Sequence, residues 1–169
     1  MHRAHLALLL PLVASLGNTL ACTSETPAAK CETYVVPPTT DLTKPTVSFK
    51  ADVLPIFVQS CAFTSCHGSA TSRNNGIGLG SKTLPNDASE IRKNIVDVKA
   101  PELPTMNFAT AGDPSQSFLM RKLDGDQCKL DAQCEKGTCL SSMPQSGDLL
   151  PVATRDTVRR WIAQGALDN

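Results

Sequence analysis

Residues 61–68 of this 169-residue chain read Cys61-Ala62-Phe63-Thr64-Ser65-Cys66-His67-Gly68, and they follow directly on an apolar segment. That segment is predicted to be a helix, because its apolar side chains recur at helical spacing behind Ser48, which can cap it. These side chains are Phe49, Val53, Ile56 and Phe57. Pro55 would bend the helix or delay its start. The cysteines and the histidine therefore begin where an amphipathic helix is expected to end.

The pair Cys66-His67, with Cys61 upstream, has the residue types that covalent haem attachment requires. Two thiols add to the two vinyl groups of haem, and the adjacent histidine reaches the iron through Nε2. The usual motif has two residues between the cysteines, whereas four residues separate Cys61 from Cys66. The loop must therefore bulge to bring both sulfurs to the fixed vinyl positions.

The first 21 residues have the layout of a signal peptide. His2, Arg3 and His5 precede an apolar run over residues 6–16, which is too short for a stable membrane anchor and is followed by small residues suited to cleavage. Removal of this peptide would leave His67 as the only histidine, so every histidine-dependent mechanism would depend on it. Export also implies an oxidising compartment, in which unmodified thiols pair.

The stretch Leu20-Ala21-Cys22 resembles a bacterial lipobox, in which cleavage precedes a cysteine that then carries lipid. The alternatives are ordinary cleavage nearby and a structural disulfide at Cys22. Acyl chains on Cys22 would hold the protein on a membrane, and Thr23 in place of an aspartate favours the outer membrane by resemblance. We therefore expect a lipoprotein of the cell envelope that faces the periplasm.

The remaining chain divides into a tether and one domain. Residues 22–47 are rich in proline and threonine, a composition typical of a flexible, extended segment. The folded domain is expected over residues 48–169. Basic and acidic side chains number 16 each, and loss of Arg3 with the signal peptide leaves a net charge near −1. Because nucleic-acid binding needs a basic surface, we expect no nucleic-acid partner.

Three further helices are predicted from start and stop signals, and the fold class is expected to be all-α. The first follows a capping box of Asp87 and Glu90 and ends at Pro101. The second starts at Asp113-Pro114 and stops at Gly125, and the third is capped by Thr154 and closed by Gly165. No convincing alternating pattern of apolar and polar residues indicates a strand.

Several segments together resemble a known family. Around the cysteine-histidine site these are Asp52-Val53-Leu54-Pro55-Ile56-Phe57, Gly112-Asp113-Pro114, Ser117-Phe118-Leu119, Lys122-Leu123, Met143-Pro144, Leu149-Leu150-Pro151 and residues 158–166. With them, the chain resembles the single-haem cytochrome c domains of bacterial envelope lipoproteins, including the planctomycete-type family, over roughly Phe49 to Ala166. The C-x4-C-H site departs from the family pattern.

The resemblance implies an electron carrier rather than a catalyst. It implies one haem c, held covalently by Cys61 and Cys66, with His67 and Met143 as the axial iron ligands and redox proteins of the envelope as partners. A thioether opposite histidine raises the reduction potential, which suits electron transfer. Met106 and Met120 are the rival ligands, and an ordinary packing role is the alternative for Met143. The cytochrome c fold also implies that Trp161 and Ile162 pack against Phe57 and Val53.

A cysteine-rich insertion over residues 126–140 precedes Met143. Its cysteines, with Cys31, are the disulfide candidates: Cys31, Cys128, Cys134 and Cys139. Four cysteines allow three pairings, and we expect one bond inside the insertion and one that ties Cys31 to it. The glycine-rich stretch of residues 76–80 does not match a dinucleotide-binding fingerprint, and we expect it to form a loop over the haem face.

Two other classes of function remain open. The chain could be a haem-free structural or interaction lipoprotein in which Cys61 and Cys66 form a disulfide and His67 is a solvated loop residue. A zinc site could use Cys61, Cys66, His67 and a later cysteine, although oxidation of the thiols competes and the spacing matches no familiar finger. Electron transfer is the leading hypothesis.

Overall fold

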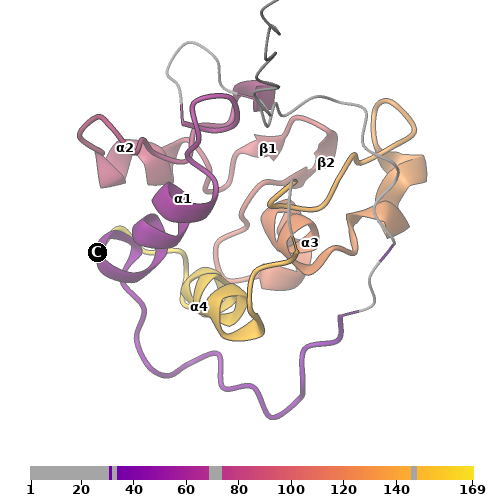
Figure 1. Cartoon of the computed structure of the whole chain (residues 1–169). Coiled ribbons are helices and arrows are strands. Elements are labelled where there is room, and N and C mark those ends of the chain that lie inside the picture. The colour runs from indigo at the N-terminus through magenta and orange to yellow at the C-terminus, as the bar shows by residue number, and fades with distance from the viewer. Residues whose placement is uncertain (1–30, 32–33, 69–73, 146–147) are drawn as a thin grey trace, which may run out of the picture.

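The computed structural model describes Cys31 and residues 34–68, 74–145 and 148–169 (Figure 1). The first helical segment begins after Ser48, whose hydroxyl accepts the N–H of Ala51 at 3.1 Å, as the cap prediction requires. A π-helical turn, η1 (Phe49–Val53), leads into α1 (Leu54–Ser60). Pro55 lies in the first turn of α1, where its missing N–H is tolerated. The proline therefore sets the start of the regular helix, as expected.

The expectation of an all-α domain is wrong, because the chain forms a small antiparallel sheet. Helix α2 (Ala88–Lys93) is capped by Asp87, whose carboxylate accepts the N–H of Glu90. The helix ends well before Pro101, and β1 (Lys99–Ala100) then pairs with β2 (Leu103–Asn107). Pro101 thus lies in the turn of a hairpin instead of closing a helix.

The last two helices differ from the prediction at their starts. Asp113 caps only a 3₁₀ turn, η3 (Pro114–Gln116), after which the extended residue Ser117 precedes α3 (Phe118–Asp124). Gly125 ends α3 in the left-handed region, at φ 74°. A second 3₁₀ segment, η4 (Gln127–Gln133), runs through the insertion. Helix α4 (Val152–Ala163) begins at Pro151, so Thr154 lies inside the helix.

The core joins η1 and α1 to α4. The ring of Trp161 lies 4.9 Å from that of Phe49, which in turn makes an edge contact with Phe57 at 6.2 Å. Trp161, Ile162, Phe57 and Val53 are all buried in the same apolar cluster. The last helix therefore packs on η1 through Trp161 and Phe49, and the predicted partners Phe57 and Val53 belong to the same core. The C-terminal Asn169 also caps this region, because its carbonyl accepts the N–H of Lys50.

The segment before the domain lies against it over its described part. The side-chain amide of Gln164 donates to the carbonyls of Leu42, Thr43 and Pro45, and its oxygen accepts the N–H of Val47. Val47 is buried. In Figure 1 this indigo-to-purple segment runs beneath α4 before it enters α1. Among the described helices, none has the length and apolar character needed to cross a membrane.

Candidate functional site

One cavity brings together the four residues predicted to hold a haem. Cys61, Cys66, His67 and Met143 all line one cavity of about 80 Å³. This volume is below the roughly 300–1,000 Å³ typical of cofactor and small-molecule sites, so a haem would require the walls to move apart. Its wall is mostly apolar and is formed by Ile77, Leu79, Phe108, Phe118, Leu119 and Leu123. The cysteine-histidine loop and the later methionine, 76 positions apart from His67 to Met143, thus belong to the same site.

His67 is oriented by a backbone carbonyl. Its Nδ1 lies 2.9 Å from the carbonyl oxygen of Ile77, which can only accept, so Nδ1 carries the proton and donates it. Burial lowers the pKa of His67, although the hydrogen bond to Ile77 and the charge of Glu102 raise it. The imidazole is therefore neutral near pH 7, and Nε2 keeps the lone pair that a metal ligand needs.

The widened loop between the cysteines is compact. The N–H of Cys66 donates to the carbonyl of Phe63 at 2.8 Å, and the N–H of His67 donates to the carbonyl of Cys61 at 3.3 Å. Gly68 closes the turn, since a Cβ at this position would lie 2.3 Å from the carbonyl oxygen of Ala62. The four intervening residues therefore fold into a bulge that still brings Cys61 and Cys66 to one cavity.

The two cysteines of the motif differ in state. The thiol of Cys61 is free and buried, and burial raises its pKa to about 12, so it stays protonated near pH 7. Cys66 is disulfide-bonded. Because Cys61 is free, the structure does not contain the Cys61–Cys66 bond of the haem-free alternative. A thioether at Cys66 would require its disulfide to be reduced first, so oxidation and haem attachment compete for this sulfur.

Among the three methionines considered as the axial ligand, Met143 differs from Met106 and Met120 in its location. It lies on the wall of the cavity, and its N–H donates to the carbonyl of Lys122 at 2.9 Å. Met120 is buried in the core cluster, and Met106 lies on β2 and packs against that cluster. Neither rival lines the cavity. The geometry therefore favours Met143 among the methionines of the described chain.

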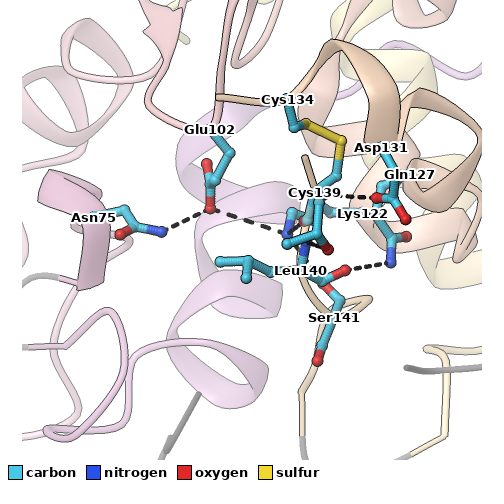
Figure 2. The surroundings of a disulfide bond; sticks show 10 residues. Asn75, Glu102, Lys122, Gln127, Asp131, Cys134, Cys139, Leu140 and Ser141 are labelled. Atoms are coloured by element: carbon cyan, nitrogen blue, oxygen red, sulfur yellow. Dashed lines mark hydrogen bonds and ion pairs between the residues drawn. A yellow bond between two sulfur atoms is a disulfide. The ribbon is translucent and has the colours of Figure 1, made fainter. Parts of the chain in front are cut away.

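A polar edge of the cavity could not be read from the sequence. Glu102 and Lys122 both line the cavity, and their charged atoms lie 4.0 Å apart. Asn75 donates its side-chain N–H to Glu102 at 2.7 Å (Figure 2). Lys122 is only 3% exposed, and burial lowers its pKa. In the sequence, Lys122 belongs to the Lys122-Leu123 segment of the family resemblance, but a lysine of an amphipathic helix normally points to solvent.

The cysteine-rich insertion forms two bonds. Cys31 is bonded to Cys128, 97 positions away, and Cys134 is bonded to Cys139 (Figure 2). One bond thus lies inside the insertion and the other ties Cys31 to it. Because these cysteines are paired, none of them can complete a zinc site. Among the described residues no group of three or more His, Cys, Asp or Glu side chains could hold a metal ion.

The remaining sequence predictions fall partly outside the structure. Ile77 and Leu79 of the glycine-rich stretch are buried on the cavity wall, so this stretch forms a loop there. Cys22, the predicted lipidation site, and the predicted signal peptide lie outside the described residues.

Comparison with known proteins gives the chain no relative from which a role could be transferred. No family model, no curated protein and no solved structure matches it.

Proposed function

We propose that this protein is an electron carrier with one covalent haem c, ligated by His67 and Met143 and attached through Cys61 and Cys66. The observation that carries the proposal is the shared cavity, in which these four residues meet although only three are close in sequence. The donor set fits the group, because His67 offers Nε2 and Met143 offers a thioether. Haem iron with such ligands supplies a reversible one-electron couple.

The chain's own residues supply orientation and exclusion of water. The carbonyl of Ile77 fixes the tautomer and the ring plane of His67. The apolar wall keeps the site at low polarity, which favours the less charged form of an iron centre and so raises its reduction potential. Both effects suit electron transfer, for which the site must change little between its two redox states.

The same proposal covers location and partners. A signal peptide over residues 1–21 and lipid on Cys22 would place the domain on a membrane facing the periplasm. The domain would lie close to that surface, because the chain is already packed on the domain at Tyr34. Redox proteins of the cell envelope are the proposed partners.

The primary test is covalent haem in protein made with cytochrome maturation machinery. We expect a haem stain that survives denaturation and haem-linked peptides that contain Cys61 and Cys66. A wild-type protein without covalent haem under these conditions would overturn the proposal.

Replacement of the axial methionine tests the site itself. Met143→Leu should retain covalent haem but lose the sulfur-to-iron absorption band. The reduction potential of the haem in this variant should fall by on the order of 100 mV or more, within the ~0.8 V range that different axial ligands span. The matched control is Met106→Leu, whose side chain is outside the cavity. Equal effects of the two substitutions on the absorption band would rule out Met143 as the ligand.

A haem-free scaffold is the second candidate, and the disulfide at Cys66 favours it. In this case the protein would be a structural or interaction lipoprotein that keeps the same helical frame. A non-reducing peptide map of protein purified from its native envelope distinguishes the two. A Cys66 disulfide in the whole population supports the scaffold, and haem-linked Cys66 excludes it.

A further inference from the structure

We propose that Lys122 is a positioning residue for Met143, holding the segment that carries this ligand against the cavity from both ends. This inference rests on the proposed haem site and gives a role to Lys122, which is part of the family resemblance but to which the resemblance assigns no role. It concerns how a methionine on an irregular segment is kept at a fixed place.

Lys122 contacts the segment through its backbone and through its side chain. The carbonyl of Lys122 accepts the N–H of Met143 at 2.9 Å. Its Nζ donates to the carbonyl of Ser141 at 3.0 Å and also to the carbonyl of Cys139 (Figure 2). A single residue of α3 therefore fixes positions 139, 141 and 143, and the last of these is the proposed ligand.

The segment has no regular secondary structure that could hold it otherwise. Residues 139–142 belong to no helix or strand, so their backbone groups need partners from elsewhere. Besides Lys122, the side-chain amide of Gln127 donates to the carbonyl of Leu140 at 3.0 Å, and Asp131 accepts the N–H of Cys139 at 2.6 Å. The Cys134–Cys139 bond anchors the start of the segment. Side chains from α3 and η4 thus supply the hydrogen bonds that the backbone of a strand or helix would otherwise make.

The Lys122 ammonium donates to two acceptors, the carbonyls of Cys139 and Ser141. The carboxylate of Glu102, 4.0 Å away, compensates its charge as an ion pair. The ammonium is 3% exposed, so a loss of these acceptors would leave a buried charge without compensation. A side chain in such surroundings has one favourable position. Through its hydrogen bonds it holds the segment that carries Met143 in a matching position.

The test is Lys122→Leu, which removes the donors and keeps an aliphatic side chain. Covalent haem should remain, because the cysteines and His67 lie on other elements. The sulfur-to-iron band should weaken, the potential should fall, and the affinity for added imidazole should rise at least about tenfold as the ligand-free fraction grows. The matched control is Lys136→Leu, an exposed lysine within the loop that the Cys134–Cys139 bond closes. It should change none of these quantities.

The outcomes separate this inference from the proposed function. Wild-type protein without haem overturns both. Haem-containing Lys122→Leu with an unchanged band and imidazole affinity overturns the positioning role alone. A lowered potential with an intact band also overturns it, because it would assign Lys122 an electrostatic effect on the iron without any effect on Met143.

A second variant covers the case in which Lys122→Leu does not fold. Gln127→Leu removes the donor to the carbonyl of Leu140, and it should be tolerated because the amide oxygen of Gln127 has no partner among the described groups. It should weaken the band and raise imidazole affinity in the same direction as Lys122→Leu, by a smaller factor. An unchanged band and affinity in folded Gln127→Leu would overturn the view that these side chains hold the ligand segment.

Discussion

Cys61 combines a free thiol with a buried position at the end of α1, and the two properties together control its chemistry. Its pKa, raised to about 12 by burial, exceeds the ordinary 9.0. The group therefore contributes stability that is fully present below pH 9.0 and is lost as the pH rises towards 12. The thiol is thus protected from oxidation and alkylation near neutral pH.

Haem-free protein should show this protection directly. At pH 8, Cys61 in the folded protein should react with iodoacetamide about 10³-fold more slowly than in urea, because its thiolate is that much rarer. Mass spectrometry of timed samples without reductant measures the rate, and the unfolded protein is the control. Modification at the same rate in both states would mean that the thiol is exposed.

At the scale of elements, α3 and α4 are joined by a buried ionic cluster. Asp124 accepts hydrogen bonds from Arg155 at 2.6 Å and from two nitrogens of Arg159 at 3.0 Å. All three side chains are buried. The ring of Tyr34 lies over both guanidinium groups, 4.4 Å from that of Arg155. The carboxylate therefore connects α3, which lines the cavity, to α4, which packs in the core.

Asp124→Ala should destabilise the protein by about 3–5 kcal/mol, because it leaves the buried guanidinium of Arg155 without its anion and that of Arg159 with Asp156 alone. Urea unfolding at pH 7 measures the change. Asp87→Ala, which removes an exposed helix cap, is the control and should cost only about 1 kcal/mol. A loss no larger than that of the control would show that water reaches the arginines.

The elements could be predicted where local signals decide them. Ser48, Asp87 and Gly125 cap helices as expected, because a cap depends only on the adjacent turn. The hairpin was missed because Pro101 resembles a helix stop, and Pro104 within β2 argues against a strand. In a sheet of two strands, however, every strand is an edge strand, and proline is tolerated there.

The site could also be predicted where its residues form a local sequence pattern. Cys61, Cys66 and His67 lie close together in the sequence, and Met143 was found through the family resemblance. The role of Lys122 could not be predicted, because its acceptors are backbone carbonyls 17 and 19 residues further along the chain. A backbone carbonyl leaves no trace in the sequence, so such a contact is visible only in the folded chain.

At the scale of the whole molecule, the described part of the segment before the domain, Cys31 and residues 34–47, is bound to the domain's surface. We call this segment the strap. Cys31 is bonded to Cys128 at its start, the ring of Tyr34 packs on Arg155, and Gln164 binds the backbone near its end. The contacts lie on the insertion and on α4. The described part of this segment is therefore held to the domain near both of its ends.

Removal of the long-range bond should weaken the entire domain while leaving the cavity intact. The Cys31→Ser, Cys128→Ser double variant releases a constraint between residues 97 positions apart, which should cost about 2–5 kcal/mol in urea unfolding. Neither cysteine lines the cavity. The sulfur-to-iron band of the haem-loaded variant should therefore match that of the wild type, whereas proteolysis within residues 34–47 should become faster. Unchanged stability and cleavage would mean that Tyr34 and Gln164 hold the strap without the bond, and a lost band would mean that the strap also supports the cavity.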